Sequence, residues 1–274
     1  MATIPASARG FGVTAVGLKL KEIGKRWSLG IASFTAFVVV WHLVTVVFDI
    51  SGLLLPQPSA VVSEFVNVWE DGLLWPAARQ SAQPLMAGLG LAIVIGIVLG
   101  LVIGASSWLD LITSPYLWGL FATPRIAMAP LFVLWFGFGF TSKVWLVFLS
   151  AVLPMTISAK EGVQTVDESL IRAARSFGAG KKDLFVNVII PYTLPFIATG
   201  VRNAIARGFV GLLIIEMTVG SGGIGSQVMK SRTDFNAARM FAFIAVLMFI
   251  AMVLITLSRK LEARMSRWRE EVYI

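Results

Sequence analysis

Six long apolar runs restrict the fold of this chain more than any other feature of its 274 residues. A helix needs about 20 mostly apolar residues to cross a hydrocarbon core ~30 Å thick. The expected fold class is therefore all-α and transmembrane, with one domain, a six-helix bundle, over residues 28–258. The predicted spans lie at about 28–48, 84–105, 111–136, 143–158, 194–219 and 237–257.

Composition and charge favour a membrane bundle over a soluble or nucleic-acid-binding protein. Hydrophobic residues make up 57% of the chain and charged residues 14%, whereas soluble domains contain about 45–50% and about 25%. The net charge of +8 comes from basic residues that flank apolar runs, which is the pattern of membrane topology. Cysteine is absent, and the single histidine, His42, has no ligand-type neighbour. We therefore expect no metal site and a packed or interfacial histidine.

Basic residues also predict the orientation of the bundle. The N-terminal segment 1–27, a polar segment at 160–195 and the tail at 259–274 hold five Lys or Arg each. The loops on the other side, with Lys143 among their residues, hold five in total. Basic residues collect in the cytoplasm, so both termini and the polar segment are expected there. Residues 1–27 lack the apolar core and cleavage site of a signal peptide, so the first span is expected to remain in the mature chain.

Gly96, Gly100 and Gly104 recur at every fourth position on one face of the second span. Small residues at this spacing allow a neighbouring helix to approach closely. The pattern predicts a packing seam, and it leaves open whether the seam slides during function or is static.

A second glycine-rich stretch, at 220–225, formally matches the pattern G-x-G-x-x-G. No strand or βαβ unit precedes it, so a dinucleotide site is not expected. An outer turn or a re-entrant loop is the prediction for this stretch.

Charged residues and prolines inside the spans are the candidates for a solute path. Arg125 lies between Pro124 and Pro130 in the third span, and Arg207 and Glu216 lie in the fifth. Prolines free backbone carbonyls, and such carbonyls and charges are tolerated at membrane depth where they face protein or a water-filled cavity. For Arg125, a place near a membrane surface or in a structural ion pair is the alternative.

The polar segment 160–195 predicts a short amphipathic helix outside the membrane. Thr165 and Glu168 fit a capping box, and the glycines from Gly178 onward stop the helix. A second short helix is expected to end at Pro191. The apolar face of the first helix is small and flat, which favours contact with a protein over the alternative, a lipid surface. That face consists of Val166, Leu170, Ala173, Ala174 and Phe177.

The same segment resembles the EAA motif of bacterial ABC-importer permeases, in which E-A-A-x-x-x-G is followed nine residues later by I-x-L-P. Ala173, Ala174, Gly178 and Pro191 match this motif in type and spacing, whereas Arg172 stands where Glu is usual. Other stretches are similar to the nitrate/sulfonate/taurine subgroup of these permeases. They lie at 55–58, 130–137, 199–202 and 216–217, the last before the glycine-rich turn.

The resemblance implies a multi-pass permease subunit of the bacterial inner membrane, not an enzyme. The implied partners are a second permease copy, identical or similar, two cytoplasmic ATPase subunits that bind ATP and Mg, and an extracytoplasmic substrate-binding protein. The sequence contains no G-x-x-x-x-G-K-[ST] loop, so we expect no ATP site and no other cofactor in this chain.

The helix at about 165–180 would be the coupling helix between the fourth and fifth spans, seated on the ATPase. Its departure from the motif at position 172 implies an acidic partner on the ATPase, or Glu168 in the role of the usual Glu. The implied ATPase contacts are Glu168, Arg172, Ala173, Ala174, Phe177 and Gly178.

The implied solute is a small anion such as sulfonate, taurine or nitrate, and a pyrimidine or vitamin precursor is the alternative. An ion-coupled secondary transporter predicts acidic residues deep in the spans, where Glu216 is the one clear carboxylate. A membrane-embedded enzyme predicts clustered His, Asp, Glu or Ser side chains, which the single histidine and the lack of paired carboxylates disfavour.

Overall fold

The computed structural model describes the backbone of residues 10–265 and the side chains of residues 28–264. Within these residues the chain is helical and contains no strand. It divides into two compact units between Ser63 and Glu64, and each is described by itself. By length and composition, five helices could cross a membrane, or six if one bent pair counts as a single span.

The first unit contains the helix α1, Gly10–Val47, and the start of α2, Pro58–Glu70. The apolar part of α1 runs over Ser28–Val47 and buries few of its side chains within the chain, as expected of a helix that faces lipid. His42 is exposed on this helix, and its backbone carbonyl accepts a hydrogen bond from the Thr45 hydroxyl at 2.8 Å.

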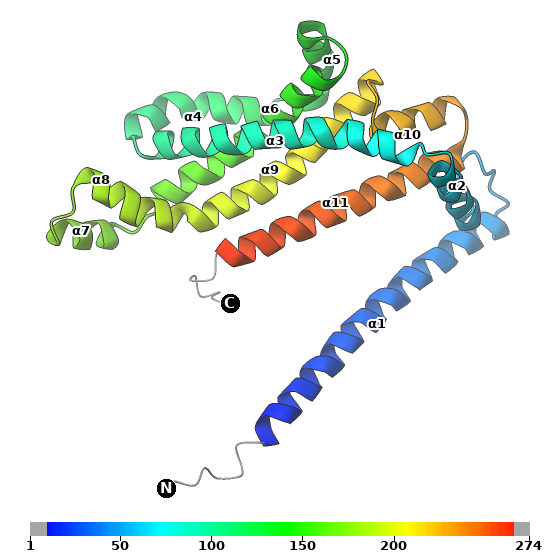
Figure 1. The fold of residues 1–274 in the computed structure, drawn as a ribbon, viewed down its shortest axis with the longest axis horizontal. Coiled ribbons are helices and arrows are strands. Elements are labelled where there is room, and N and C mark those ends of the chain that lie inside the picture. Colours follow the sequence, from blue (N-terminus) through cyan, green and yellow to red (C-terminus); the bar gives the residue numbers. More distant parts are fainter. Residues whose placement is uncertain (1–9, 266–274) are drawn as a thin grey trace. The chain divides into compact units, whose positions relative to one another are not determined.

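The second unit is built around α6, which packs between α3 and α9, and α11 packs on α9 (Figure 1). Most of the apolar stretch of α6 is buried, whereas α3, α9 and α11 each keep an exposed apolar side. The helices that follow α2 are α3 Leu74–Gly104, α4 Ser107–Ala122, α5 Arg125–Phe136, α6 Phe140–Gln164, α7 Glu168–Ser176, α8 Lys181–Leu184, the π-helix η2 Phe185–Ile189, α9 Ile190–Val219, α10 Ile224–Thr233 and α11 Ala237–Met265.

A line of glycines allows α3 and α6 to lie in close contact. The structure places Gly96, Gly100 and Gly104 against α6, and Gly88, two steps earlier on the same line, also contacts α6. A Cβ atom on Gly100 would lie 2.5 Å from the Ala159 Cβ and 2.6 Å from the Thr156 carbonyl oxygen. Because no side chain fits at this distance, the two helices touch through their backbones over much of their length.

We expect Gly100→Ala to destabilise the bundle by about 1–3 kcal/mol, because the added methyl group overpacks the seam. Gly90→Ala is the matched control, since Gly90 lies on the same helix with nothing within 4 Å of its would-be Cβ. Thermal unfolding of the purified protein in detergent measures both. Equal melting temperatures for the two variants would show that the seam is not tightly packed.

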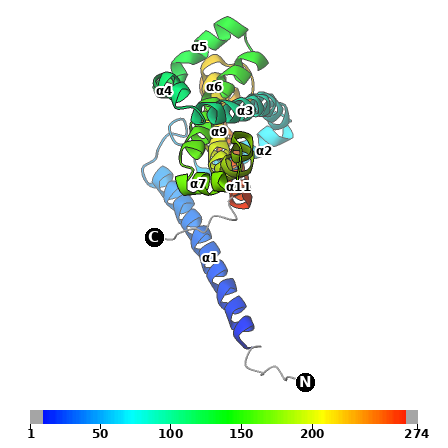
Figure 2. The same ribbon diagram turned by 90° about the vertical axis from the view of Figure 1, so that its left-hand side faces the viewer.

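The third predicted span is not one kinked helix but two helices, α4 and α5, bent by 96° (Figure 2). The break falls at Thr123, whose φ of −65° and ψ of 131° are extended, followed by Pro124 as the N-cap of α5. A residue before proline is disfavoured in the helical region, which explains the break at this place. Pro115 and Pro130, in contrast, lie inside α4 and α5.

Several helix boundaries differ from the predictions, and two of the differences involve a proline. α3 begins at Leu74 instead of near Pro84, which it contains. Pro191 does not end a helix, because α8, η2 and α9 follow one another without a break and Pro191 lies in the first turn of α9. The π-helical turn before it leaves room for the proline, whose missing N–H costs little in a first turn.

Candidate functional site

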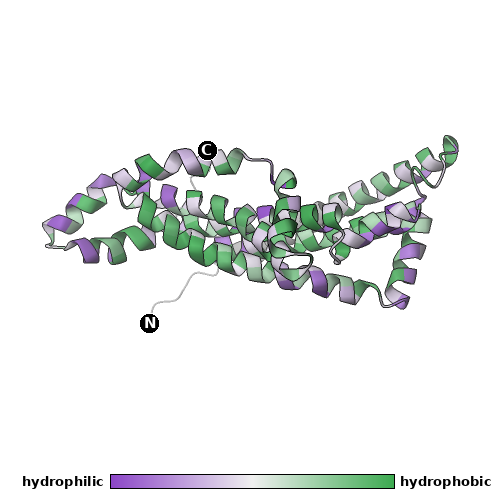
Figure 3. Cartoon of the chain, turned by 90° about the horizontal axis from the view of Figure 1, so that it is seen from above, coloured by the Kyte–Doolittle hydropathy of each residue, from purple (hydrophilic) through white to green (hydrophobic). Residues whose placement is uncertain are grey.

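The helix α7 lies at one end of the second unit, between α6 and α8, and hydrophilic residues gather there (Figure 3). Its N-cap is Asp167, whose Oδ1 accepts a hydrogen bond from the Ser169 backbone N–H at 2.7 Å. That hydrogen bond lowers the pKa of the Asp167 carboxyl. The predicted cap, Thr165, is wrong, because its hydroxyl donates to the Glu161 carbonyl at 2.8 Å and thus belongs to the end of α6.

The side chains of α7 are exposed or half-buried in the described chain. None of its residues is buried, and the ring of Phe177, directly after it, is 91% exposed. Arg172 pairs with Glu168 one turn earlier, with Nη1 and Oε2 3.0 Å apart. The cation at the usual Glu position thus has a local counter-ion, although pairs this exposed contribute little stability.

Gly178 ends α7 in the left-handed conformation, with φ at +85°. Its N–H donates to the Arg175 carbonyl at 2.9 Å, and the N–H of Ala179 donates to the Ala174 carbonyl at 3.1 Å. A side chain at this position would be strained, and open space surrounds it.

A polar cluster ties the last turns of α6 to the start of α4. Lys160 Nζ lies 2.8 Å from Asp110 Oδ1 and donates to the Ser114 hydroxyl at 2.9 Å. Gln164 Nε2 donates to the other oxygen of Asp110 at 2.8 Å. Lys160, predicted as the first residue of the polar segment, is a buried residue of α6 instead. Its partner, Asp110, comes from a helix that is distant in sequence.

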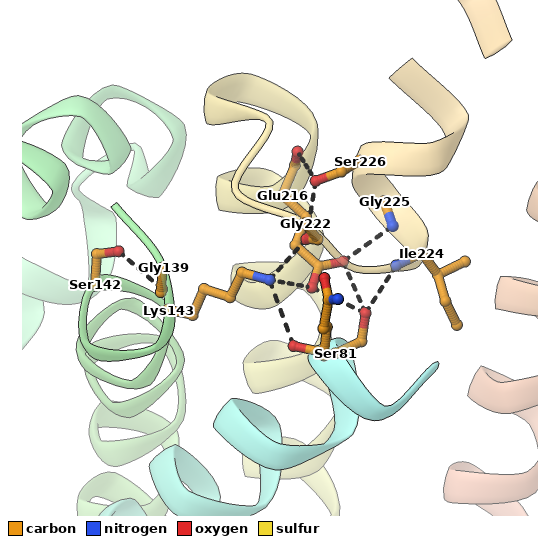
Figure 4. Close-up of polar contacts among 10 residues, drawn as sticks. Ser81, Gly139, Ser142, Lys143, Glu216, Gly222, Ile224, Gly225 and Ser226 are labelled. Atoms are coloured by element: carbon orange, nitrogen blue, oxygen red, sulfur yellow. Dashed lines mark hydrogen bonds and ion pairs between the residues drawn. The ribbon is translucent and has the colours of Figure 1, made fainter. Parts of the chain in front are cut away.

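At the opposite end of α6, Lys143 and Glu216 form an enclosed ion pair (Figure 4). Lys143 Nζ lies 2.9 Å from Glu216 Oε1 and donates to the Gly222 carbonyl at 2.7 Å. The two side chains are 2% and 0% exposed. Lys143 was predicted at the outer end of the fourth span, and its burial is possible because the carboxylate and the carbonyl replace its hydration.

The Glu216 carboxylate also holds the glycine-rich stretch. It accepts from the Ser81 hydroxyl at 2.9 Å and from the Gly225 N–H at 2.9 Å, while Ser81 accepts from the Ile224 N–H (Figure 4). A Cβ atom on Gly223 would overlap the carboxylate, which explains a glycine there. Glu216, expected along the solute path, is thus enclosed in a structural network that attaches α10 to α3 and α9.

Arg125 and Arg207, which the sequence also predicted for the path, come together around one aromatic ring. The Cζ atom of Arg125 lies 5.6 Å from the centre of the Phe121 ring, and that of Arg207 lies 5.9 Å from it. Pro124 lies at the break beside them, whereas Pro130 is exposed further along α5. Nothing in the spacing along the sequence indicated Phe121 as their common contact.

The sequence did not predict the partners in these networks, among them Ser81, Asp110 and Lys143. Each lies near the end of an apolar stretch, where a polar residue is ordinary, and its partner is distant in sequence. A search for opposite charges at matching depths of different spans could have suggested the pairs. Within the described residues, no three His, Asp or Glu side chains group as a metal site would require.

Residues 92–267 match the family described as "Binding-protein-dependent transport system inner membrane component". The taurine transport system permease protein TauC of Escherichia coli (strain K12) is 32% identical, and the match covers 91% of this chain and 93% of TauC. The putative aliphatic sulfonates transport permease protein SsuC of Bacillus subtilis (strain 168) is 28% identical, over 89% and 88%. A chain of the inward-facing MetNI methionine ABC transporter superposes with a TM-score of 0.58 at 19% identity, over 70% of this chain and 96% of that one.

Proposed function

This chain belongs to the inner-membrane components of binding-protein-dependent transport systems, and on that premise we propose that it transmits ATP-driven movement through α7 to a path for a small anion. The observation that carries the proposal is α7 itself. It is a capped helix with an exposed surface. The chain connects it to α6 on one side and to α8 on the other.

The connections of α7 suit it to pass a movement on. α6 continues to Gln164 and is separated from α7 by three residues, and α8, η2 and α9 follow one another after α7. A displacement of α7 therefore acts on α6 and α9, two helices that pack against each other. ATP-driven closure of a partner would bias the bundle between two arrangements, as a ligand biases any two-state element.

The proposed assembly contains two permease copies, two cytoplasmic ATPase subunits that bind ATP and Mg, and an extracytoplasmic binding protein. The excess of Lys and Arg in 1–27, 160–195 and 259–274 supports an orientation with α7 and both termini in the cytoplasm. The local pair between Arg172 and Glu168 leaves the smaller residues Ala173, Ala174 and Gly178 as the centre of the proposed ATPase contact.

The proposed solute is a small sulfonate such as taurine. Relatives named for taurine and for aliphatic sulfonates match along nearly the whole chain. The test is ATP-driven uptake of labelled taurine into vesicles that contain this permease, its ATPase and its binding protein. Uptake of a neutral pyrimidine but not of sulfonates would overturn the proposed solute class and leave the coupling role in place.

We expect Gly178→Trp to release the ATPase, with copurification at least about tenfold lower, because a bulky side chain at a positive φ distorts the proposed contact. Gly72→Trp is the matched control. Gly72 has a φ of +66° and open space around it, like Gly178, but precedes α3 and is distant from α7 in the chain. Pull-down of the ATPase by each tagged permease measures the effect, and equal recovery with both variants would contradict docking at α7.

A further inference from the structure

Two cations on apolar helices, Arg125 half-buried and Arg207 exposed, share one aromatic ring and no carboxylate. Arg125 and Arg207 reach Phe121 from different helices, α5 and α9. Among residues 28–264, no ion pair involves either arginine. Like charges repel, and a ring face offsets only a small part of the cost of a cation in apolar surroundings. The pair is therefore incomplete without an anion.

The hydrogen-bonding groups of Arg125 indicate how an anion would bind. Its Nε and Nη2 atoms are buried and have no acceptor within the described chain. These two N–H groups form one edge of the guanidinium, the edge that binds a planar or tetrahedral oxyanion through two parallel hydrogen bonds. Buried donors without a partner are uncommon and costly, so this edge is the expected contact for a ligand.

The depth of the cluster argues for a solute over a lipid headgroup. Arg207 lies 17 residues after the start of α9 and 12 residues before its end. At 1.5 Å per residue, the nearer end is about 18 Å away. A lipid phosphate lies at the membrane surface, whereas a solute that crosses the membrane must pass this level. Arg125 is also the first residue of α5, where the helix dipole favours a negative charge.

We propose that Arg125 and Arg207, which both contact Phe121, form a binding site for a small oxyanion, the sulfonate group of the solute in transit. This proposal deepens the proposed function and rests on it, since it assigns the anion to a place within the spans. Arg125 binds the oxyanion through its Nε–Nη2 edge. Arg207 supplies a second positive charge at the same ring.

The test is binding of labelled methanesulfonate to the permease–ATPase complex in nanodiscs, with and without ATP and without the binding protein. Arg125→Gln and Arg207→Gln should each weaken binding about tenfold or more, because each removes a charged hydrogen-bonding partner. Arg125→Lys should give an intermediate loss, since it keeps the charge but not the two-donor edge. The matched control is Arg202→Gln, which lies on α9 like Arg207. Arg202 already pairs with Glu262 at 3.3 Å, so this substitution is expected to leave binding unchanged.

Three outcomes would overturn the proposal. They are equal binding by all variants, no binding by any complex in either nucleotide state, and phospholipid that copurifies in an Arg125-dependent amount and is not displaced by methanesulfonate. ATP-driven taurine uptake by the same complexes, with the binding protein added, separates a failure of the internal site from a failure of the proposed function. If the wild type and both Gln variants import equally, the internal site fails and the importer stands. If the wild type imports no sulfonate, the proposed function fails first.

Discussion

Glu216→Gln is expected to lower the free energy of unfolding by about 3–5 kcal/mol, because Lys143 would keep a buried charge without its counter-ion. The two side chains are almost completely enclosed, and their atoms lie 2.9 Å apart. Gln keeps the shape of Glu and can still accept from Ser81, so the loss reports mainly on the charge. Thermal or denaturant unfolding of the purified protein in detergent measures it.

The double variant Lys143→Met with Glu216→Gln is expected to be more stable than Glu216→Gln alone, since no unpaired charge remains. Glu168→Gln serves as the control, because its pair with Arg172 is exposed and a surface change of this kind is usually within about 0.5 kcal/mol. If Glu216→Gln unfolds like the control, the enclosed pair does not stabilise the attachment of α10 and the glycine-rich stretch.

Asp110→Asn is expected to uncouple ATP hydrolysis from transport, with the ATP consumed per solute rising about tenfold. Asp110 holds Lys160 and Gln164, which lie in the last turns of α6 just before α7. The carboxylate thereby connects the helix next to the proposed ATPase contact with α4, which leads to the break and to Arg125. Coupling between two sites typically amounts to about 5- to 150-fold, so the loss of a central contact is measurable.

Parallel measurements of ATPase activity and uptake in vesicles give this ratio for each variant. Asp71→Asn is the control, because Asp71 is exposed in the turn before α3. Uptake that falls only in proportion to the amount of assembled complex would contradict the link, since the residue would then contribute to folding alone.

The sequence by itself determined the helical class, the number of apolar stretches and the existence of α7. These features depend on local properties: the length of an apolar run and a glycine that ends a helix at Gly178. The break at Pro124 was not predicted, because a proline inside an apolar run can also be accommodated as a kink. The spacing of Gly96, Gly100 and Gly104 likewise predicted a close helix contact, although not that α6 would be the neighbour.

Only the tertiary structure decided which polar groups meet. Lys143 and Glu216 are 73 residues apart in the chain, and Lys160 and Asp110 are 50 apart. The sequence placed Glu216 with Arg125 and Arg207 because all three are costly in lipid. The structure separates them, since Glu216 finds a lysine and backbone N–H groups while the arginines share Phe121. Burial makes any polar residue need a partner, but packing alone selects that partner.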